Sequence, residues 1–150
     1  MIHISISTLY KKNVTKESLS DAAISTLEYE KIDPEINDIS ILVRNDPFIR
    51  KLKKQYFGID EATDVLSFPA GDADPESGHI YLGDIVISFP QAENNALAAN
   101  KSTRSEISLL VVHGVLHLLG YDHADEESQK NMWAKQEMIL NKLEGKKKDG

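Results

Sequence analysis

The stretch HGVLHLLGYDH, from His113 to His123, is the strongest indication of function in this sequence. It holds three of the five histidines of the chain. His113 and His117 lie one turn apart on a helix, so their side chains project from the same face. Gly120 then ends that helix, because glycine adopts a positive φ at little steric cost. The reversed chain can bring His123 back towards the first two histidines.

Three neutral imidazoles with an open fourth position are typical of a catalytic zinc site. The chain has no cysteine, so a metal site has to use imidazole or carboxylate ligands. We therefore expect one Zn²⁺ per chain, held by His113, His117 and His123, although three imidazoles also accept nickel, cobalt or copper. The alternative for the first two is a hydrogen-bonded pair in the core. His3 and His79 are expected to be ordinary strand or surface residues.

The same stretch fits the zinc-endopeptidase pattern H-E-x-x-H-x-x-G-x-x-H at every fixed position except the second, where Gly114 replaces glutamate. In those peptidases the glutamate is the general base that takes a proton from zinc-bound water. Gly114 therefore predicts a hydrolase that has the peptidase ligands and extra room beside the metal, but lacks the peptidase base. The nearby Asp122 is a candidate for orienting a ligand or accepting the proton, or it only caps the turn.

Length and composition indicate one globular domain over residues 1–150, with a flexible tail at about residues 145–150. Of the 150 residues 41% are hydrophobic and 27% are charged, as in ordinary soluble proteins. The apolar runs are too short to span a bilayer and the N-terminus has no apolar leader, so we expect a cytoplasmic protein without a membrane partner.

The net charge of −7 argues against a nucleic-acid partner, and DNA is not expected. The charge is unevenly spread, however. The segment from Gln55 to Asn100 contains no Lys or Arg, and a short basic segment precedes it. Its cations are Arg44, Arg50, Lys51, Lys53 and Lys54. A basic face of this kind can contact a phosphate backbone locally.

Hydrophobic periodicity predicts strands near residues 2–8 and 38–44, and two further strands in TDVLSFP and HIYLGDIVISF. Capping residues and helix stops predict five helices. The first three run from the Thr15 cap to about residue 31, from Asp46-Pro47 to Gly58, and from Pro90 to about residue 100. The last two run from the capping box at residues 103–106 to Gly120, and from the Asp125 cap to about residue 143. In the second helix we expect Phe48, Leu52 and Tyr56 to face the core. The order of elements predicts an α+β domain with a mixed sheet of about four strands packed against helices. The zinc site would lie on a helix in the C-terminal region, in a metzincin-like arrangement.

Together with ATDVLSFP, LGDIVIS and MWAKQEMIL, the histidine stretch closely resembles the YbeY family of bacterial endoribonucleases, which mature ribosomal RNA. The resemblance covers most of the chain from about Tyr56 to Leu140. It implies a sheet that backs a zinc-bearing helix, with His113, His117 and His123 as the metal ligands. TDVLSFP and LGDI would line the cleft over the metal. The implied function is rRNA processing, notably at the 3′ end of the small-subunit RNA, and ribosome quality control. Precursor rRNA is the implied substrate, with the ribosome or ribosomal proteins as possible partners.

The chain departs from that family at one position. Many members have Tyr-Arg-Gly where this sequence has Tyr-Phe-Gly, so the guanidinium that could hold a phosphate is replaced by Phe57. Either Lys53, Lys54 or Arg104 substitutes for it as a substrate-binding cation, or the catalytic strength or the substrate differs. Packing at a helix end is an equally good explanation of Phe57.

The implied reaction is hydrolysis of an RNA phosphodiester, in which zinc would lower the pKa of its bound water from 15.7 towards ~7. Three routes stay open: attack by the metal-bound hydroxide itself, transfer of the proton to Asp122, and attack by the 2′-hydroxyl of the RNA. The carboxylates between Asp60 and Glu93 would repel RNA if they lined the same cleft.

Two other functions stay open as well. One is a zinc peptidase or amidase that lacks the usual glutamate base, and the other is a non-catalytic ribosome-associated factor with a structural metal.

Overall fold

A computed structural model describes residues 1–122 and 124–149, with side chains as far as residue 145. In this part of the chain the elements follow in the order β1 (Ile2–Ile6), α1 (Lys16–Tyr29), β2 (Asn37–Arg44), α2 (Asp46–Phe57), β3 (Val65–Ala73), β4 (Ile80–Ser88), α3 (Phe89–Ala98), α4 (Thr103–Leu118) and α5 (Glu126–Asp149). No helix within these ranges is long and apolar enough to cross a membrane.

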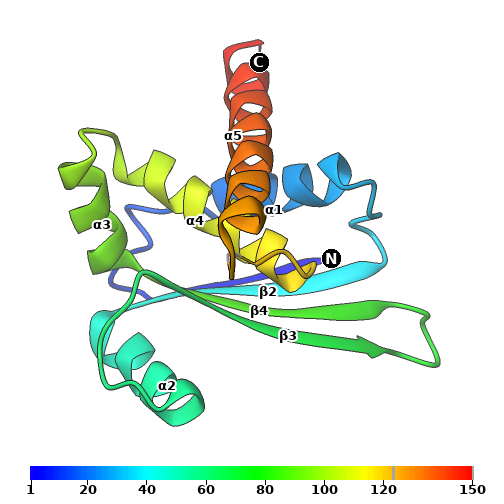
Figure 1. Ribbon diagram of the computed structural model, residues 1–150, viewed down its shortest axis with the longest axis horizontal. Coiled ribbons are helices and arrows are strands. Elements are labelled where there is room, and N and C mark those ends of the chain that lie inside the picture. The colour runs from blue at the N-terminus through cyan, green and yellow to red at the C-terminus, as the bar shows by residue number, and fades with distance from the viewer. Residues whose placement is uncertain (123, 150) are drawn as a thin grey trace.

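The described strands form one sheet in the order β1-β2-β4-β3. β1 pairs with β2 and β2 with β4 in parallel, whereas β3 and β4 form an antiparallel hairpin. Helices α1, α4 and α5 lie over one face of the sheet, and α2 lies against the other face (Figure 1). This arrangement confirms the predicted α+β class with a four-stranded mixed sheet.

Alternation along the central strands explains why most helices gather on one face. Every second residue of β2 and β4 is fully buried there, namely Ile39, Ile41, Val43, Ile85 and Ile87. α4 is the central helix of this layer, because it contacts α1, α3 and α5 as well as the hairpin β3–β4. It is accordingly apolar on nearly all sides, as expected for a helix that is surrounded by protein.

α2 differs from its prediction in its cap and in its buried face. The side chain of Asn45, and not that of Asp46, caps the helix by accepting a hydrogen bond from the backbone N–H of Phe48 at 3.1 Å. The fully buried residue of α2 is Ile49, whereas Phe48 is 39% and Tyr56 61% exposed. The prediction was therefore wrong for the two aromatic residues, whereas Leu52 is partly buried and packs against the cluster of Ile49, Leu66 and Val86 as expected.

The two C-terminal helices begin and end close to their predicted positions. Ser102, one residue before the expected Thr103, caps α4 by accepting a hydrogen bond from the N–H of Ser105 at 3.1 Å. The predicted cap of α5 is confirmed, since Asp125 accepts from the N–H of Ser128 at 2.7 Å. The backbone of α5 continues past residue 143, where the prediction ended it, to Asp149.

Two glycines allow α4 to approach the sheet closely. A Cβ atom on Gly114 would lie 2.9 Å from Cγ2 of Ile85 on β4, well inside van der Waals contact. Gly83 on β4 has a φ of 143°, and a Cβ there would overlap the carbonyl oxygen of Phe68 and approach Leu118 of α4 at 2.8 Å. The expectation of extra room beside the metal at Gly114 was wrong, because Ile85 occupies that space.

Gly114→Ala is expected to lower the free energy of unfolding by about 1–3 kcal/mol, because the added methyl group overpacks the contact with Ile85. This net loss includes a gain of up to ~1 kcal/mol in helix propensity. Urea unfolding of both proteins measures the difference.

Gly145→Ala is the matched control, since no atom lies within 4 Å of a Cβ at that helical glycine. It should be neutral or stabilising by up to ~1 kcal/mol. In an Ile85→Ala background, Gly114→Ala should no longer destabilise the protein. An equal loss in both backgrounds would contradict the packing explanation.

Candidate metal centre

The end of α4 has the chain reversal that the sequence predicts. Gly120 has a φ of 101°, and its N–H donates a hydrogen bond to the carbonyl oxygen of His117 at 3.0 Å. The N–H of Tyr121 donates to the carbonyl oxygen of Leu116 at 3.1 Å. These two bonds form a Schellman motif, which satisfies the last carbonyls of the helix and turns the chain sharply.

His113 and His117 converge through one ring nitrogen each. Their Nε2 atoms are 3.0 Å apart, and their ring planes meet at 70°. Zn–N distances of about 2.0–2.1 Å place two ligand nitrogens on one cation roughly 3 Å apart. The described donor set therefore fits a cation that prefers imidazole nitrogen.

Gln136 on α5 orients the first of these rings. Its Oε1 lies 3.1 Å from Nδ1 of His113. An amide oxygen only accepts hydrogen bonds, so this contact favours the tautomer in which Nδ1 carries the proton and Nε2 keeps the lone pair that can bind a cation. Hydrogen bonds of this type fix the tautomer and raise the basicity of a metal ligand.

The neighbouring Lys135 holds α5 in the position that this contact requires. Its Nζ lies 3.1 Å from Oε2 of Glu30, the C-cap of α1, and 5.2 Å from the ring centre of Tyr121. Hydrogen bonding to Tyr121 and to Glu30 raises the pKa of the Lys135 ammonium. Lys135 thus ties α5 both to α1 and to the segment that follows the Schellman turn.

The third predicted ligand, His123, lies outside the described residues. Within residues 1–122 and 124–149, no group of three or more His, Asp or Glu side chains is placed to hold a metal ion. Asp122 is exposed, and its Oδ1 accepts a hydrogen bond from the N–H of Ala124 at 3.1 Å, which caps the turn. The zinc site and a proton-accepting role of Asp122 stay predictions.

The two histidines open onto a cleft of about 520 Å³, which we call the metal cleft. Its described lining comes from α2, from the start of β3 with the preceding residues, and from α4. The lining residues are Lys53, Phe57, Thr63, Asp64, Val65, Leu66, Ser67, Pro69, His113 and His117. The segment TDVLSFP therefore lies along this cleft, whereas LGDI contributes the close contact between β4 and α4.

Of the three predicted substrate-binding cations, only Lys53 lines the metal cleft. Its Nζ lies 3.0 Å from Oε1 of Glu61, and its side chain is 16% exposed. Arg104 lines two other hollows, at the N-terminal end of α4, whereas the histidines are near the C-terminal end of that helix.

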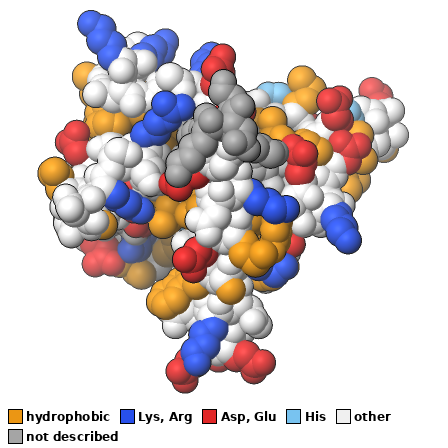
Figure 2. Space-filling view, turned by 90° about the horizontal axis from the view of Figure 1, so that it is seen from above, with side chains coloured by type: hydrophobic (Ala, Val, Ile, Leu, Met, Phe, Trp, Pro, Cys, Tyr) orange, Lys and Arg blue, Asp and Glu red, His pale blue; other side chains and the backbone are white. Residues whose placement is uncertain are grey.

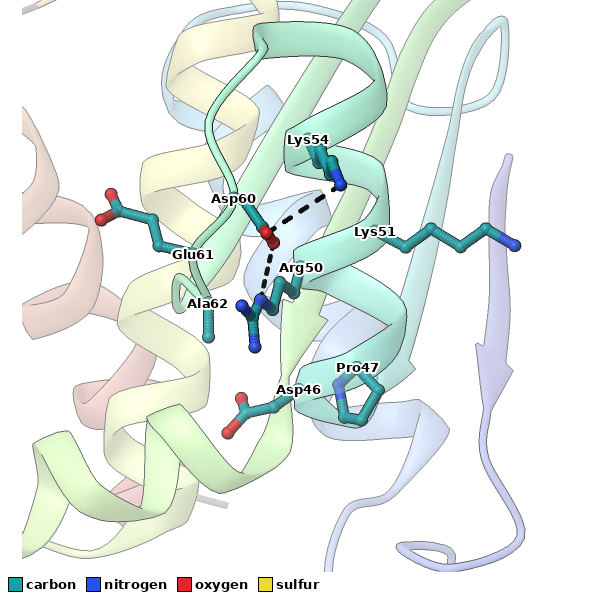
Figure 3. Close-up of a pocket in the computed structure, with 8 residues that line it drawn as sticks. All are labelled: Asp46, Pro47, Arg50, Lys51, Lys54, Asp60, Glu61 and Ala62. Atoms are coloured by element: carbon teal, nitrogen blue, oxygen red, sulfur yellow. Dashed lines mark hydrogen bonds and ion pairs between the residues drawn. The ribbon is translucent and has the colours of Figure 1, made fainter.

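Lys54 lines a separate pocket of about 680 Å³ between α2 and the loop that follows it. Figure 3 shows the carboxylate of Asp60 between Arg50 and Lys54 in this pocket. Nε of Arg50 lies 2.7 Å from Oδ1 of Asp60, and Nζ of Lys54 lies 4.0 Å from Oδ2. The hydrogen bond from Arg50 lowers the pKa of Asp60. These two cations are therefore already partnered.

The acidic middle of the chain contributes little negative charge to the metal cleft. Asp64 is the one carboxylate in its described lining, and both oxygens of that group accept hydrogen bonds. The donors are the N–H of Val65 at 2.8 Å and Nδ2 of Asn95 at 3.0 Å. Asp84 lines a different groove, on the face of the sheet that carries α2. On the face seen in Figure 2, blue and red side chains are interspersed.

The sequence did not predict that Gln136 contacts His113, or that Asp64 lines the cleft with both oxygens hydrogen-bonded. Gln136 lies 23 residues from its partner His113, and one polar residue in a polar helix gives no signal of such a contact. Asp64 was treated only as one of many repulsive carboxylates. Its pairing with Asn95 depends on how α3 packs.

Comparisons with known proteins agree on one family. The family model described as Endoribonuclease YbeY matches residues 3–144. A protein named Endoribonuclease YbeY from Pelotomaculum thermopropionicum is 40% identical over 92% of this chain and 95% of its own length. One of the same name from Dehalococcoides mccartyi is 36% identical, over 93% and 87% respectively. The solution structure of TM1509 from Thermotoga maritima superposes with a TM-score of 0.67 at 28% identity, covering 99% of this chain and 93% of that one.

Gln136→Leu is expected to weaken zinc binding about 10- to 100-fold, because the ring of His113 loses the partner that orients it. Competition with a chromophoric zinc chelator measures the affinity. Gln136→Glu keeps an acceptor at this position and should retain tight binding.

Glu137→Gln, a change at the exposed neighbour of Gln136, is the control and should leave the zinc affinity unchanged. Wild-type affinity in Gln136→Leu would show that the Nδ1 contact does not support the metal ligand.

Proposed function

The chain belongs to the YbeY family of endoribonucleases, and from this premise we propose that it is a zinc-dependent endoribonuclease that acts on precursor ribosomal RNA. We propose the 3′ end of the small-subunit RNA as its site of action, a part in ribosome quality control, and the cytoplasm with the ribosome as its setting. The observation that carries the proposal is the convergence of two histidine Nε2 atoms, 3.0 Å apart, in a cleft that also holds a lysine.

His113 and His117, with His123, would hold the zinc ion. When bound there, Zn²⁺ supplies Lewis acidity that activates water and neutralises charge on the phosphoryl oxygens. Gln136 keeps Nε2 of His113 unprotonated and directed towards the cation. Lys53 supplies the positive charge for a phosphate at the side of the cleft formed by α2.

Lys53 is suited to this role although it is paired. Its partner Glu61 is 64% exposed, and an ion pair of this kind contributes only about 0–1 kcal/mol. A phosphate group can therefore displace Glu61 at little cost.

The described lining of the cleft holds one carboxylate that could act as a general base, Asp64. Asp64 is a poor candidate, since both of its oxygens already accept hydrogen bonds. This observation also weighs against a peptidase, which would need a free carboxylate in the cleft. Asp122 as proton acceptor and the 2′-hydroxyl of the RNA as nucleophile both stay within the proposal.

The decisive measurement is cleavage of a precursor small-subunit rRNA fragment by zinc-loaded protein and by identically purified His117→Ala. We expect cutting by the wild type and only the protein-free background with the variant, because a metal ligand is lost. Equal cutting by both would indicate a contaminating ribonuclease, and no cutting by either would contradict an isolated enzyme. An unstructured protein offered under the same conditions tests the peptidase alternative.

Lys53→Ala is expected to weaken binding of single-stranded RNA and to reduce the slope of log K against log salt by about 0.7, the contribution of one phosphate contact. Fluorescence anisotropy over a salt series measures both quantities. Glu61→Gln should have the opposite effect on affinity, because it removes the competing carboxylate.

Lys54→Ala changes the net charge by the same amount as Lys53→Ala, but it lies outside the metal cleft. It should change the slope little. Equal effects of both lysines would mean that only the overall charge matters.

A further inference from the structure

Phe57 is the aromatic residue in the described lining of the metal cleft. It is the last residue of α2, and its side chain is 51% exposed. Lys53 precedes it by one helical turn and lines the same cleft, so the two side chains are neighbours on one face of α2. A lysine and an exposed aromatic ring thus line the same cleft as the histidine pair.

The ring of Phe57 is supported by a second ring. Its centre lies 5.9 Å from that of Phe68 on β3, at an angle of 35° between the planes. Gly58 then ends the helix with a φ of 70°, which fixes the point at which Phe57 leaves the α2 surface. A supported and exposed ring has little freedom left to lose when a flat ligand stacks on it.

We propose that Phe57 stacks on a nucleobase of single-stranded RNA in the metal cleft, next to the phosphate held by Lys53. The inference rests on the proposed function and adds how the substrate is positioned there. Every base has a π-face, so stacking on aromatic side chains tolerates many sequences, whereas the bases of a duplex are already stacked and paired. Phe57 would therefore select unpaired nucleotides without reading their sequence.

The neighbouring Tyr56 provides an internal comparison. It is 61% exposed and also packs on Phe68, with ring centres 5.2 Å apart. It lines a separate groove of about 430 Å³ with Phe48, Leu52 and Asp84, on the far side of Phe68 from the metal cleft. Tyr56 and Phe57 are thus adjacent and similarly exposed, but Tyr56 lines the separate groove and Phe57 lines the metal cleft with the histidines.

The test uses a single-stranded oligoribonucleotide that carries one 2-aminopurine, a base whose fluorescence is quenched by stacking. With wild-type protein we expect the fluorescence of 2-aminopurine to be quenched when this base is the one that stacks on Phe57. Phe57→Leu keeps an apolar side chain but lacks a π-face. It should abolish the quenching and weaken binding about 5- to 150-fold.

Phe57→Trp should preserve both the quenching and the affinity, and Tyr56→Leu should leave both unchanged. Thermal unfolding of each variant shows that the fold is kept. An abasic site at the quenched position should weaken binding to the wild type but not to Phe57→Leu.

The inference is overturned if Phe57→Leu binds and quenches like the wild type, or if Tyr56→Leu loses as much as Phe57→Leu. In either case RNA cleavage by the wild type would still support the proposed function. A wild-type protein that neither binds nor cleaves single-stranded RNA would instead overturn the proposed function, and this inference with it.

Discussion

α4 packs unusually close to the hairpin β3–β4, and this contact sets the position of the helix that carries both histidines. Glycine is required at position 114, because a side chain there would collide with Ile85. Glycine is also required at position 83, because a side chain there would collide with Leu118 and with the backbone of β3. Because α4 lies so near the sheet, its histidine face opens directly onto the segment that leads into β3. The metal cleft is the space left between that face, the segment and the end of α2. A bulkier residue at either glycine would move the helix that carries both histidines.

The orientation of the histidines depends on a second packing layer. α5 crosses α4, and Gln136 reaches back to Nδ1 of His113. The position of α5 depends in turn on Lys135, which bonds to Glu30, the C-cap of α1, and lies over the ring of Tyr121. A residue of α5, 23 positions further along the chain, therefore orients a histidine of the cleft. Elements that hold a ligand in this way are as much a part of a metal centre as the ligands themselves.

The charge distribution shows how an acidic chain can still offer a site to an anion. Asp64, the carboxylate in the described lining of the metal cleft, is engaged by Asn95 and by the backbone N–H of Val65. In the segment before β3, Asp60 is paired with Arg50 and Glu61 with Lys53. Lys53 is the described cation in the cleft, and its partner is exposed and readily displaced. Net charge thus says little about a local surface, because pairing and placement decide which charges a ligand meets.

The class of the fold, the helix that carries the paired histidines and the glycine reversal after it could all be predicted from the amino-acid sequence. These follow from local rules, since periodicity, capping residues and the positive φ of Gly120 act within a few residues. Tertiary structure alone decided that Gly114 faces Ile85 rather than open space, that Gln136 orients His113, and that Lys53 lines the cleft while Lys54 and Arg104 do not. It also decided that Ile49, and not Phe48 or Tyr56, is the buried residue of α2. Each of these depends on distances between segments far apart in the chain, which packing sets and local sequence does not encode.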